Sequence, residues 1–487
     1  MMATQQSAAL KNLTAGFAEV GGDIQVTGLT LDSRSVAPGD LFLAMPGGAH
    51  DGRDYIGKAL AAGAAAVLGE QPLPADSLDT ARVIAVKALS RYAGTIADRF
   101  YDQPSRHLCV VGITGTNGKT TCSHLMAQAL EFLGTPSGVL GTVGYGRLSD
   151  LKSSALTTAD VISVHRQLYE LLEAGAHSVC MEVSSHALDQ GRVDKVAFDL
   201  AMFTNLSQDH LDYHDDMASY GAAKARLFHQ ADLTACVINV DDSFGRYLAG
   251  QVEDRLLWSY GRSEDARLRL LGAEPESGGQ TIEIEFEKIR SRTFVPLAGD
   301  FNADNVTAVI AALLALGFPR RRVEAAMASL KPVAGRMETI TQAGKPVVVI
   351  DYAHTPDALE KVLHACRGSS AGELWLVFGC GGDRDREKRP QMGAIAEQHA
   401  DRIIVTNDNP RGEDPGAIAG DILAGMSEPA EVCLDRADAI ASAIGRAAPD
   451  DIVLVAGKGH ETGQIVADQV LPFNDREVVG RLLGGGL

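Results

Sequence analysis

Residues 108–121 read Leu-Cys-Val-Val-Gly-Ile-Thr-Gly-Thr-Asn-Gly-Lys-Thr-Thr. A short apolar run, a turn with two glycines and a polar helix start predict a strand, a loop and a helix N-terminus in succession. The free backbone N–H groups of such a loop and the helix dipole point at one spot, which suits a phosphate group. A lysine at the start of the helix supplies a positive charge for the β- and γ-phosphates, and the threonine after it supplies a hydroxyl for Mg²⁺. The stretch predicts a nucleoside triphosphate site at Gly115, Thr116, Asn117, Gly118, Lys119, Thr120 and Thr121.

The match to the general phosphate-loop pattern is incomplete, because that pattern has glycine where this chain has Ile113. The alternative is an ordinary strand-to-helix turn that carries Lys-Thr. We favour the nucleotide site because Gly115 and Gly118 are both in place. A second glycine cluster, residues 379–384, lacks the third glycine of a dinucleotide fingerprint, so NAD is not expected.

Outward from this stretch, short apolar runs alternate with alanine-rich helical segments, as in residues 374–378 followed by 389–400. This alternation predicts α/β domains on largely parallel sheets, with ligand loops at the carboxyl ends of the strands. A length of 487 residues suggests about three domains. Polar turns at 101–105 and 330–335 place them at 1–103, 104–332 and 333–487.

Composition excludes several classes of protein. A net charge of -19 opposes nonspecific binding to nucleic acid, which rewards basic surfaces. Seven scattered cysteines without a Cys-x-x-Cys pair argue against a disulfide framework and fit a reducing compartment. The N-terminus lacks an export signal, and the longest apolar stretch, 306–318, is shorter than the ~20 residues of a membrane span. We expect a cytoplasmic protein without a membrane span.

Four further blocks follow the phosphate loop in a recognisable order. They are Met-Glu-Val-Ser-Ser-His at 181–186, Asn-Leu-Ser-Gln-Asp-His-Leu-Asp-Tyr-His at 205–214, Gly-Arg-Met-Glu at 335–338 and Asp-Tyr-Ala-His-Thr-Pro at 351–356. With them the chain resembles, nearly end to end, the Mur ligase family of peptidoglycan synthesis. The resemblance implies an N-terminal UDP-substrate-binding α/β domain, a central ATP-binding P-loop domain and a C-terminal Rossmann-like domain that binds an amino acid.

Two residues are candidate Mg²⁺ ligands. Glu182 ends an apolar run, so a strand would deliver its carboxylate to the edge of the sheet; by itself it could equally be a surface residue. His210 lies in an acidic segment whose alternative is a solvated loop. Its spacing to His214 suits zinc, but Leu211 replaces the glutamate of a metalloprotease motif. The resemblance makes Glu182 and His210 ligands of Mg²⁺.

Lys224 shares a predicted helix face with Tyr220 and Phe228, four residues away on either side. A lone lysine on an apolar face usually extends its amine to solvent. In the family, the matching lysine is carbamylated by CO₂, which turns a cation into an anionic oxygen ligand. The resemblance thus implies two Mg²⁺ ions, with metal ligands Thr120, Glu182, His210 and carbamylated Lys224, and catalytic residues Lys119, Lys224, Glu182 and His210.

Further site residues follow from the resemblance, although each also has a plain structural alternative such as a helix cap or turn. Those implied to contact ATP are Asn302, Arg336 and His354. Those implied to contact a UDP-muramoyl dipeptide are Leu31, Ser33, Gly48, Ala49, His50, Thr157, Thr158, Ser184, Gln190 and Arg192.

The block Asp408-Asn409-Pro410-Arg411 bears on the incoming amino acid. An arginine in a proline-stiffened loop can pair with a distal carboxylate, whereas it repels the ammonium of a lysine substrate. The alternative is a surface turn. In the family this signature marks members that add meso-diaminopimelate, and Arg384, Gly457 and Glu461 would complete the pocket.

The expected activity is ATP-dependent amide bond formation between meso-diaminopimelate and the D-glutamyl γ-carboxylate of UDP-N-acetylmuramoyl-L-alanyl-D-glutamate, through an acyl phosphate. The expected partners are these small molecules, and the expected state is a monomer. A P-loop kinase or motor would not need Lys224 on an apolar face, and a nucleotide switch would have no use for Arg411. A lysine-adding Mur ligase and a folylpolyglutamate synthase-like ligase are closer alternatives, and Arg411 argues against both.

Overall fold

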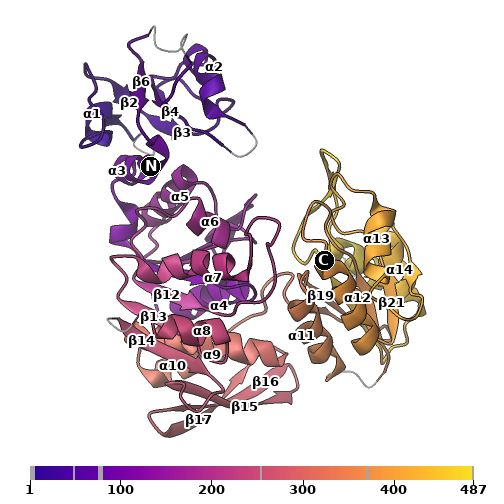
Figure 1. Ribbon diagram of the computed structural model, residues 1–487. Coiled ribbons are helices and arrows are strands. Elements are labelled where there is room, and N and C mark those ends of the chain that lie inside the picture. Colours follow the sequence, from indigo (N-terminus) through magenta and orange to yellow (C-terminus); the bar gives the residue numbers. More distant parts are fainter. Residues whose placement is uncertain (1–5, 48–49, 75–79, 253–254, 369–371, 485–487) are drawn as a thin grey trace. The chain divides into compact units, whose positions relative to one another are not determined.

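The computed structural model describes residues 6–47, 50–74, 80–252, 255–368 and 372–484 (Figure 1). The chain forms two compact units. One comprises Met1–Gly112, Thr135–Asp199 and Gln230–Leu233, and the other Ile113–Gly134, Leu200–His229 and Thr234–Leu487. The three domain ranges expected from the sequence stay a prediction.

The first unit begins with a four-stranded parallel sheet. Its strands, in spatial order, are β3 (Gly28–Thr30), β4 (Asp40–Ala44), β5 (Ala66–Glu70) and β6 (Val83–Val86). Apolar side chains of β4 alternate between two cores: Phe42 packs with α2 (Ile56–Ala61), whereas Leu41 and Leu43 pack with α3 (Ala93–Phe100). Also in this unit are β1 (Ala8–Ala9), α1 (Leu10–Leu13), β2 (Gln25–Val26), η1 (Gly52–Tyr55), η3 (Leu89–Arg91) and η4 (Pro104–His107).

The central sheet has eleven strands in the order β10-β9-β8-β11-β7-β12-β13-β14-β15-β16-β17. Parallel pairs join β8 to β11 and run from β12 through β15, whereas the outer strands pair antiparallel. The strands are β7 (Cys109–Thr114), β8 (Ser137–Leu140), β9 (Tyr145–Arg147), β10 (Asp150–Lys152), β11 (Ser178–Glu182), β12 (Leu200–Phe203), β13 (Ala235–Asn239), β14 (Leu256–Gly261), β15 (Leu268–Glu276), β16 (Gly279–Phe286) and β17 (Ile289–Val295).

The helices connected to this sheet are α4 (Lys119–Phe132), α5 (Val161–Glu173), α6 (Ser185–Asp189), α7 (Met217–Ala225), η5 (Arg226–His229), α8 (Ser243–Ala249), α9 (Asp300–Ala315) and α10 (Arg320–Met327). Helix α9 is apolar on nearly all sides, and it is accordingly buried between α4 and strands β13 to β15.

The C-terminal part of the chain folds on a six-stranded sheet, parallel except for its first strand. In spatial order these strands are β18 (Glu338–Ile340), β19 (Val347–Asp351), β23 (Ile452–Ala456), β20 (Leu374–Phe378), β21 (Arg402–Val405) and β22 (Glu431–Val432). A hairpin of β24 (Gly463–Val466) and β25 (Gln469–Pro472) follows.

Helices cover both faces of this six-stranded sheet, because its strands are apolar on both sides. Leu374, Leu376 and Phe378 of β20 face one core, and Trp375 and Val377 face the other, as the two-residue period of a strand requires. The first core is closed by α11 (Pro356–Arg367), α12 (Lys388–His399) and α13 (Pro415–Leu423), and the second by α14 (Arg436–Arg446) and α15 (Asp475–Leu483).

The predicted α/β architecture is confirmed, with local corrections. Helix α9 begins at Asp300, so Asn302 lies inside its first turn and Gly299 takes the cap position. Helix α7 ends at Ala225, and Phe228 lies in the following 3₁₀ turn, although Tyr220, Lys224 and Phe228 are all buried as expected. Within the described residues, no helix has the length and apolar character to cross a bilayer.

Candidate active site

The loop between β7 and α4 depends on its two glycines. Gly115 and Gly118 have φ values of 149° and 85°, in the region that favours glycine. A Cβ atom on Gly115 would lie 1.9 Å from Thr204 Oγ1, and one on Gly118 would lie 2.6 Å from Asn305 Oδ1. Both glycines are therefore required by conformation and by space. Ile113, in the place of the missing glycine, is a fully buried residue of β7.

Two lysines donate hydrogen bonds to this loop. Lys119 Nζ lies 2.9 Å from the carbonyl oxygen of Gly115 and 2.8 Å from that of Thr116. Lys224 Nζ donates to the same Gly115 oxygen at 2.8 Å. The structure thus brings Lys119 and Lys224 together at the phosphate loop, although 105 positions separate them in the sequence.

Lys224 does not extend its amine to solvent, since the residue is 1% exposed. Its Nζ lies 4.3 Å from the centre of the Tyr220 ring. Burial, together with the charge of Lys119, lowers the pKa of Lys224 well below its ordinary value. A buried amine that favours its neutral form is nucleophilic, which is the property that reaction with CO₂ requires.

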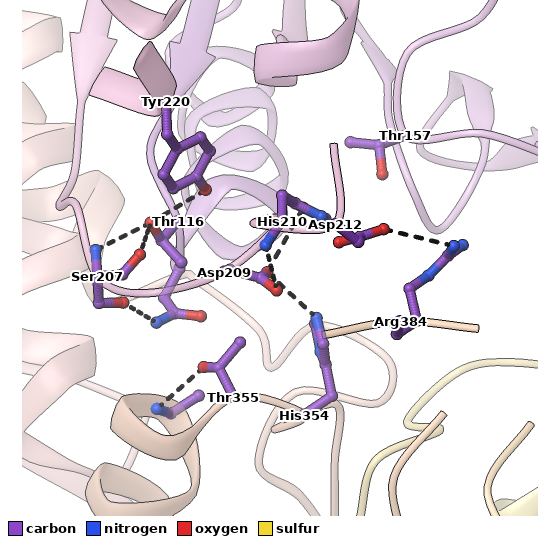
Figure 2. A network of polar contacts seen from close by, with 12 residues as sticks. Thr116, Thr157, Ser207, Asp209, His210, Asp212, Tyr220, His354, Thr355 and Arg384 are labelled. Carbon is purple, nitrogen blue, oxygen red and sulfur yellow. Dashed lines mark hydrogen bonds and ion pairs between the residues drawn. The ribbon is translucent and has the colours of Figure 1, made fainter. Parts of the chain in front are cut away.

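Asp209 organises a second cluster, and Figure 2 shows it between His210 and His354. Its carboxylate lies 3.4 Å from His210 Nε2, 3.8 Å from His354 Nε2 and 3.7 Å from Lys388 Nζ. Burial alone raises the pKa of Asp209, but the charges of His210, Lys388 and His354 outweigh it, so the pKa falls well below its ordinary value. Burial and the charge of Lys388 lower the pKa of His354. Asp209 is thus an anion that orients both predicted histidines.

Other predicted ATP residues also contact the loop or its helix. Arg336 Nη2 donates to the hydroxyl of Thr120 at 3.0 Å. Asn117 donates to Asp357 Oδ2 at 2.9 Å, at the start of α11. Asn302 donates to the carbonyl oxygen of Ala298 and accepts a hydrogen bond from Asn305, the residue beside Gly118. Arg336 and Asn302 are therefore tied, directly or through one neighbour, to the phosphate loop and its helix.

In the first unit, Glu182 ends β11, as predicted. Its carboxylate is buried and accepts hydrogen bonds from the backbone N–H of Thr142 at 2.8 Å and from the Thr142 hydroxyl at 3.0 Å. Thr157 Oγ1 lies 3.1 Å from the Thr142 hydroxyl oxygen, which can accept a hydrogen bond from it. The Glu182 carboxylate is therefore held in one orientation by neutral donors. Its relation to the phosphate loop stays a prediction.

The predicted dipeptide-binding residues of the central region form one connected group. Thr158 Oγ1 donates to the carbonyl oxygen of Glu182 at 2.9 Å and accepts from the backbone N–H of Ser184 at 3.1 Å. Arg192 donates to the carbonyl oxygen of Thr158 at 2.9 Å and holds the amide oxygen of Gln190 with its Nε and Nη2 atoms at 2.8 and 2.6 Å. Hydrogen bonds thus join four of the five predicted residues next to the end of β11, and Thr157 is connected to Glu182 through Thr142.

Near the N-terminus, Leu31 packs against the core of the first unit, and Ser33 is 8% exposed. His50 is exposed. Gly48 and Ala49 lie outside the described residues. A uridine site at these positions stays a prediction.

The predicted amino-acid loop is built around a lysine that the sequence reasoning missed. Lys458 is fully buried, and its Nζ lies 3.0 Å from Asn409 Oδ1, 2.8 Å from Glu461 Oε2 and 3.5 Å from Asp408 Oδ1. Asn409 also donates to Glu461 Oε2 at 2.9 Å. Gly457, with φ 116°, brings the backbone close to Asp408. Lys458 thus joins Asp408, Asn409 and Glu461 into one wall.

Arg411 follows Pro410 and has φ 50°, an uncommon conformation for arginine. Its Nη1 donates to the carbonyl oxygen of Gly382 at 2.9 Å. Burial lowers the pKa of Arg411, and the charge of Arg384 lowers it further. The guanidinium groups of Arg411 and Arg384 are close enough to repel each other, so an anion bound between them would be favoured. Arg384 also lies 3.9 Å from Asp212 Oδ2 (Figure 2).

Sequence reasoning therefore missed Thr142, Asp209, Lys388 and Lys458. Asp209 is next to His210 in the sequence, and Lys458 is next to Gly457, both of which were predicted as site residues. A charged residue adjacent to a predicted site residue could therefore have indicated them. Thr142 and Lys388 carry no local signal, because only the fold brings them to Glu182 and Asp209.

Three family models match this chain. The family model for the Mur ligase middle domain matches residues 113–313, that for the Mur ligase glutamate ligase domain matches 335–459, and that for the Mur ligase family catalytic domain matches 25–101. Among solved structures, one titled as a UDP-N-acetylmuramoyl-L-alanyl-D-glutamate–2,6-diaminopimelate ligase has a TM-score of 0.69 and 32% identity, covering 98% of this chain and 99% of that one. MurF from Acinetobacter baumannii shares the fold, with a TM-score of 0.69 at 17% identity and 97% coverage of both chains.

Two curated relatives carry the name UDP-N-acetylmuramoyl-L-alanyl-D-glutamate–2,6-diaminopimelate ligase. The protein from Xanthomonas campestris pv. campestris (strain 8004) is 49% identical over 474 residues, which cover 95% of this chain and 94% of the relative. The protein from Pseudomonas aeruginosa PAO1 is 48% identical, covering 96% of this chain and 97% of the relative. On these matches, together with the site described above, the chain belongs to the Mur ligase family.

Proposed function

We propose that this protein is an ATP-dependent ligase that joins meso-2,6-diaminopimelate to the D-glutamyl γ-carboxylate of UDP-N-acetylmuramoyl-L-alanyl-D-glutamate in peptidoglycan synthesis. The relatives named above support the reaction. The observation that carries the choice of amino acid is the pair of guanidinium groups of Arg411 and Arg384, which favours the second carboxylate that diaminopimelate has and lysine lacks.

In the first step, a carboxylate oxygen of the dipeptide attacks the γ-phosphorus of ATP, the bond to the bridging oxygen breaks, and ADP leaves with that electron pair. Lys119 and the backbone N–H groups of residues 115–120 neutralise charge on the phosphates. Lys119 then exchanges its hydrogen bonds with Gly115 and Thr116 for bonds with phosphate oxygens. The acyl phosphate that results holds a carbonyl carbon ready for an amine.

In the second step, the neutral amine of diaminopimelate attacks that carbonyl carbon, and phosphate leaves with the electrons of the broken C–O bond. The nitrogen loses one proton as the amide forms, and the departing phosphate can accept it. The wall formed by Asp408, Asn409 and Glu461 would hold the amino acid at its distal end, with Lys458 fixing all three side chains. No side-chain nucleophile is needed, because positioning and charge neutralisation carry the reaction.

The residues predicted to hold Mg²⁺ fit a hard cation once Lys224 is carbamylated. Mg²⁺ prefers oxygen ligands, which the Thr120 hydroxyl and the buried Glu182 carboxylate would provide, and the predicted ligand set also includes the His210 imidazole. When bound, the ions would withdraw negative charge from the phosphates. The proposal also includes two Mg²⁺ ions, the carbamate on Lys224, a monomeric state and a cytoplasmic location. It further includes three domains with the ranges 1–103, 104–332 and 333–487.

The function is tested by phosphate release from ATP in the presence of the UDP-linked dipeptide and either diaminopimelate or lysine. We expect release with diaminopimelate and a loss of at least tenfold in kcat/KM when Arg411 is replaced by alanine. Activity confined to lysine would identify a lysine-adding ligase, and activity confined to folate and glutamate substrates would identify a folylpolyglutamate synthase-like enzyme.

The carbamate is tested separately. We expect native mass spectra to contain a species heavier by one CO₂, activity to rise with added bicarbonate, and Lys224→Ala to lose both the adduct and activity. The control variant Lys345→Ala changes an exposed lysine in a turn and should alter neither. An adduct that persists in Lys224→Ala would place the modification elsewhere.

A further inference from the structure

A cluster outside the proposed active site has the composition of a transition-metal site. It consists of Glu360 and His364 on α11 and His399 at the end of α12. One ligand atom from each residue lies within 4.8 Å of the other two. We propose that these three side chains bind one divalent transition-metal ion, with Zn²⁺ as the expected occupant.

The backbone already places the three side chains together. Glu360 and His364 are four residues apart, so they lie one above the other on the same face of α11. Leu359, Val362 and Leu363 of that helix pack with Met392 and Ala396 of α12 in one buried core, which fixes the two helices against each other. The site therefore needs no folding of a loop around the ion, and its three ligands come from two rigid helices.

The distances require only small side-chain movements. Glu360 Oε1 lies 3.7 Å from His399 Nε2. Ligand atoms about 2.0–2.1 Å from a tetrahedral Zn²⁺ are about 3.4 Å from one another, so this pair is already close to the spacing of two ligands. The rings of His364 and His399 have their centres 4.4 Å apart. Glu360 and His364 are exposed and free to rotate towards a shared ion.

His399 supplies an independent indication. Its Nε2 atom is enclosed by protein and makes no hydrogen bond with any of the described residues, and the 3.7 Å separation from Glu360 is too long for one. An enclosed nitrogen without a hydrogen bond is unfavourable, whereas the lone pair of a neutral imidazole is a good metal ligand. A dication at the cluster would satisfy this atom and pair with the Glu360 carboxylate.

Neighbouring charges are compatible with a cation. Arg367, one turn after His364 on α11, donates to the carbonyl oxygen of His399 at 3.3 Å, but its charge is paired with Asp401 at 2.6 Å. Lys361 is likewise paired with Asp357 at 2.8 Å. The two imidazole ligands favour Zn²⁺ or Ni²⁺ over Mg²⁺, which prefers a set made of oxygen ligands alone. The site would thus be separate from the Mg²⁺ sites of the proposed reaction.

The position suggests what the ion would do. His354 immediately precedes the N-terminal cap of α11, and Lys388 is the first residue of α12, and both contact Asp209. The cluster joins the opposite end of α12 to the middle of α11. A bound ion would therefore fix the spacing of two helices whose N-termini carry residues of the proposed ATP site.

The test is isothermal titration of chelator-treated full-length protein with Zn²⁺ in buffer containing excess Mg²⁺. We expect one Zn²⁺ per chain, a rise in melting temperature, and a visible absorption band of low-symmetry Co²⁺ when Co²⁺ replaces Zn²⁺. His364→Ala, an exposed change that leaves the core intact, should weaken binding at least tenfold, and Glu360→Gln should weaken it less. The matched control His177→Ala removes an exposed histidine elsewhere and should bind as the parent protein does.

Unchanged Zn²⁺ affinity and Co²⁺ absorption in both His364→Ala and His399→Gln would overturn the proposal. Loss of binding in His210→Ala with retention in His364→Ala would also overturn it, because the ion would then belong to the proposed active site. These outcomes do not depend on catalytic activity, so they stand apart from the test of the proposed function.

Discussion

Lys119 and Lys224 converge on one carbonyl oxygen, that of Gly115, and this arrangement ties the phosphate loop to helix α7. Two ammonium groups at one acceptor repel each other, and burial selects Lys224 as the one that favours the neutral form. Burial thus suits Lys224 to the reaction with CO₂ that is proposed for it.

Gly118→Ala tests the phosphate loop at the scale of one atom. The added Cβ would lie 2.6 Å from Asn305 Oδ1, and alanine at φ 85° costs about 1–2 kcal/mol. We expect ATP affinity to fall at least tenfold, measured by titration calorimetry. Gly134→Ala is the matched control, because it has φ 86° with nothing within 4 Å of the new Cβ. It should lower stability by a similar amount with unchanged ATP affinity; equal loss of affinity in both variants would contradict the steric argument.

At the residue scale, the sequence predicted the position of residues that belong to contiguous motifs. Examples are Gly115 in the loop after a strand, Lys119 at a helix start and Glu182 at the end of a strand. It also predicted that Lys224 lies among apolar residues, since helical spacing reports the buried face. It did not predict Lys458 or Lys388, because their importance comes from contacts with Asn409 and Asp209. Such contacts between distant segments have no local pattern.

At the scale of elements, Glu413 connects the start of α12 to the turn before α13. It accepts hydrogen bonds from Arg389 Nη1 and Nη2 at 3.0 and 2.8 Å, and Arg389 is fully buried. These bonds lower the pKa of Glu413 to about 2 from an ordinary 4.5. Ionised Glu413 therefore stabilises the folded chain above pH 4.5, and that contribution is lost as the pH falls from 4.5 towards 2.

Glu413→Gln should accordingly lower the free energy of unfolding at pH 7, and the difference from the parent protein should shrink as the pH approaches 2. The measurement is urea unfolding in a Trp258→Phe background, in which Trp375 of β20 remains as the fluorescent reporter. The control Glu428→Gln changes an exposed residue of the same region. A stability difference that is independent of pH would show that the ionised carboxylate is not the source.

The bounds of helices and strands also show where the structure follows the sequence pattern and where it differs from it. Strand β20 has the bounds that were predicted, 374–378, because five apolar residues between polar turns have one consistent interpretation. At the start of α9, the asparagine and aspartate residues by themselves favour a turn. Tertiary packing instead extends the helix to Asp300, and Asn302 uses its amide within the helix to reach Ala298.

At the scale of the molecule, the C-terminal part has its own cores. The buried residues of the two cores on either face of the six-stranded sheet all lie between Val348 and Leu483. Phe301, from outside that range, is partly buried and packs against one of these cores. The range also contains an ion pair, Arg436 with Asp475, in which both side chains are fully buried. Such a pair is satisfied only in the folded state.

We therefore expect residues 333–487 to fold when expressed alone. Circular dichroism should show mixed α/β content, and urea unfolding should be a single transition. Arg436→Ala in this fragment should lose about 3–5 kcal/mol, since it leaves the Asp475 carboxylate buried without its partner. A fragment without a cooperative transition would move the domain boundary away from residue 332.

The eleven-stranded sheet ends in β10 on one side and in β17 on the other. Strand β10 has three residues, and β17 carries Arg290, which pairs with Glu285 of the adjacent β16, and Arg292, which pairs with Glu274 of β15. A free strand edge can recruit the edge of another molecule and start aggregation, and shortness and charge are two ways in which proteins prevent this. The two ends of the sheet thus protect the protein against self-association through its own backbone, a safeguard independent of catalysis.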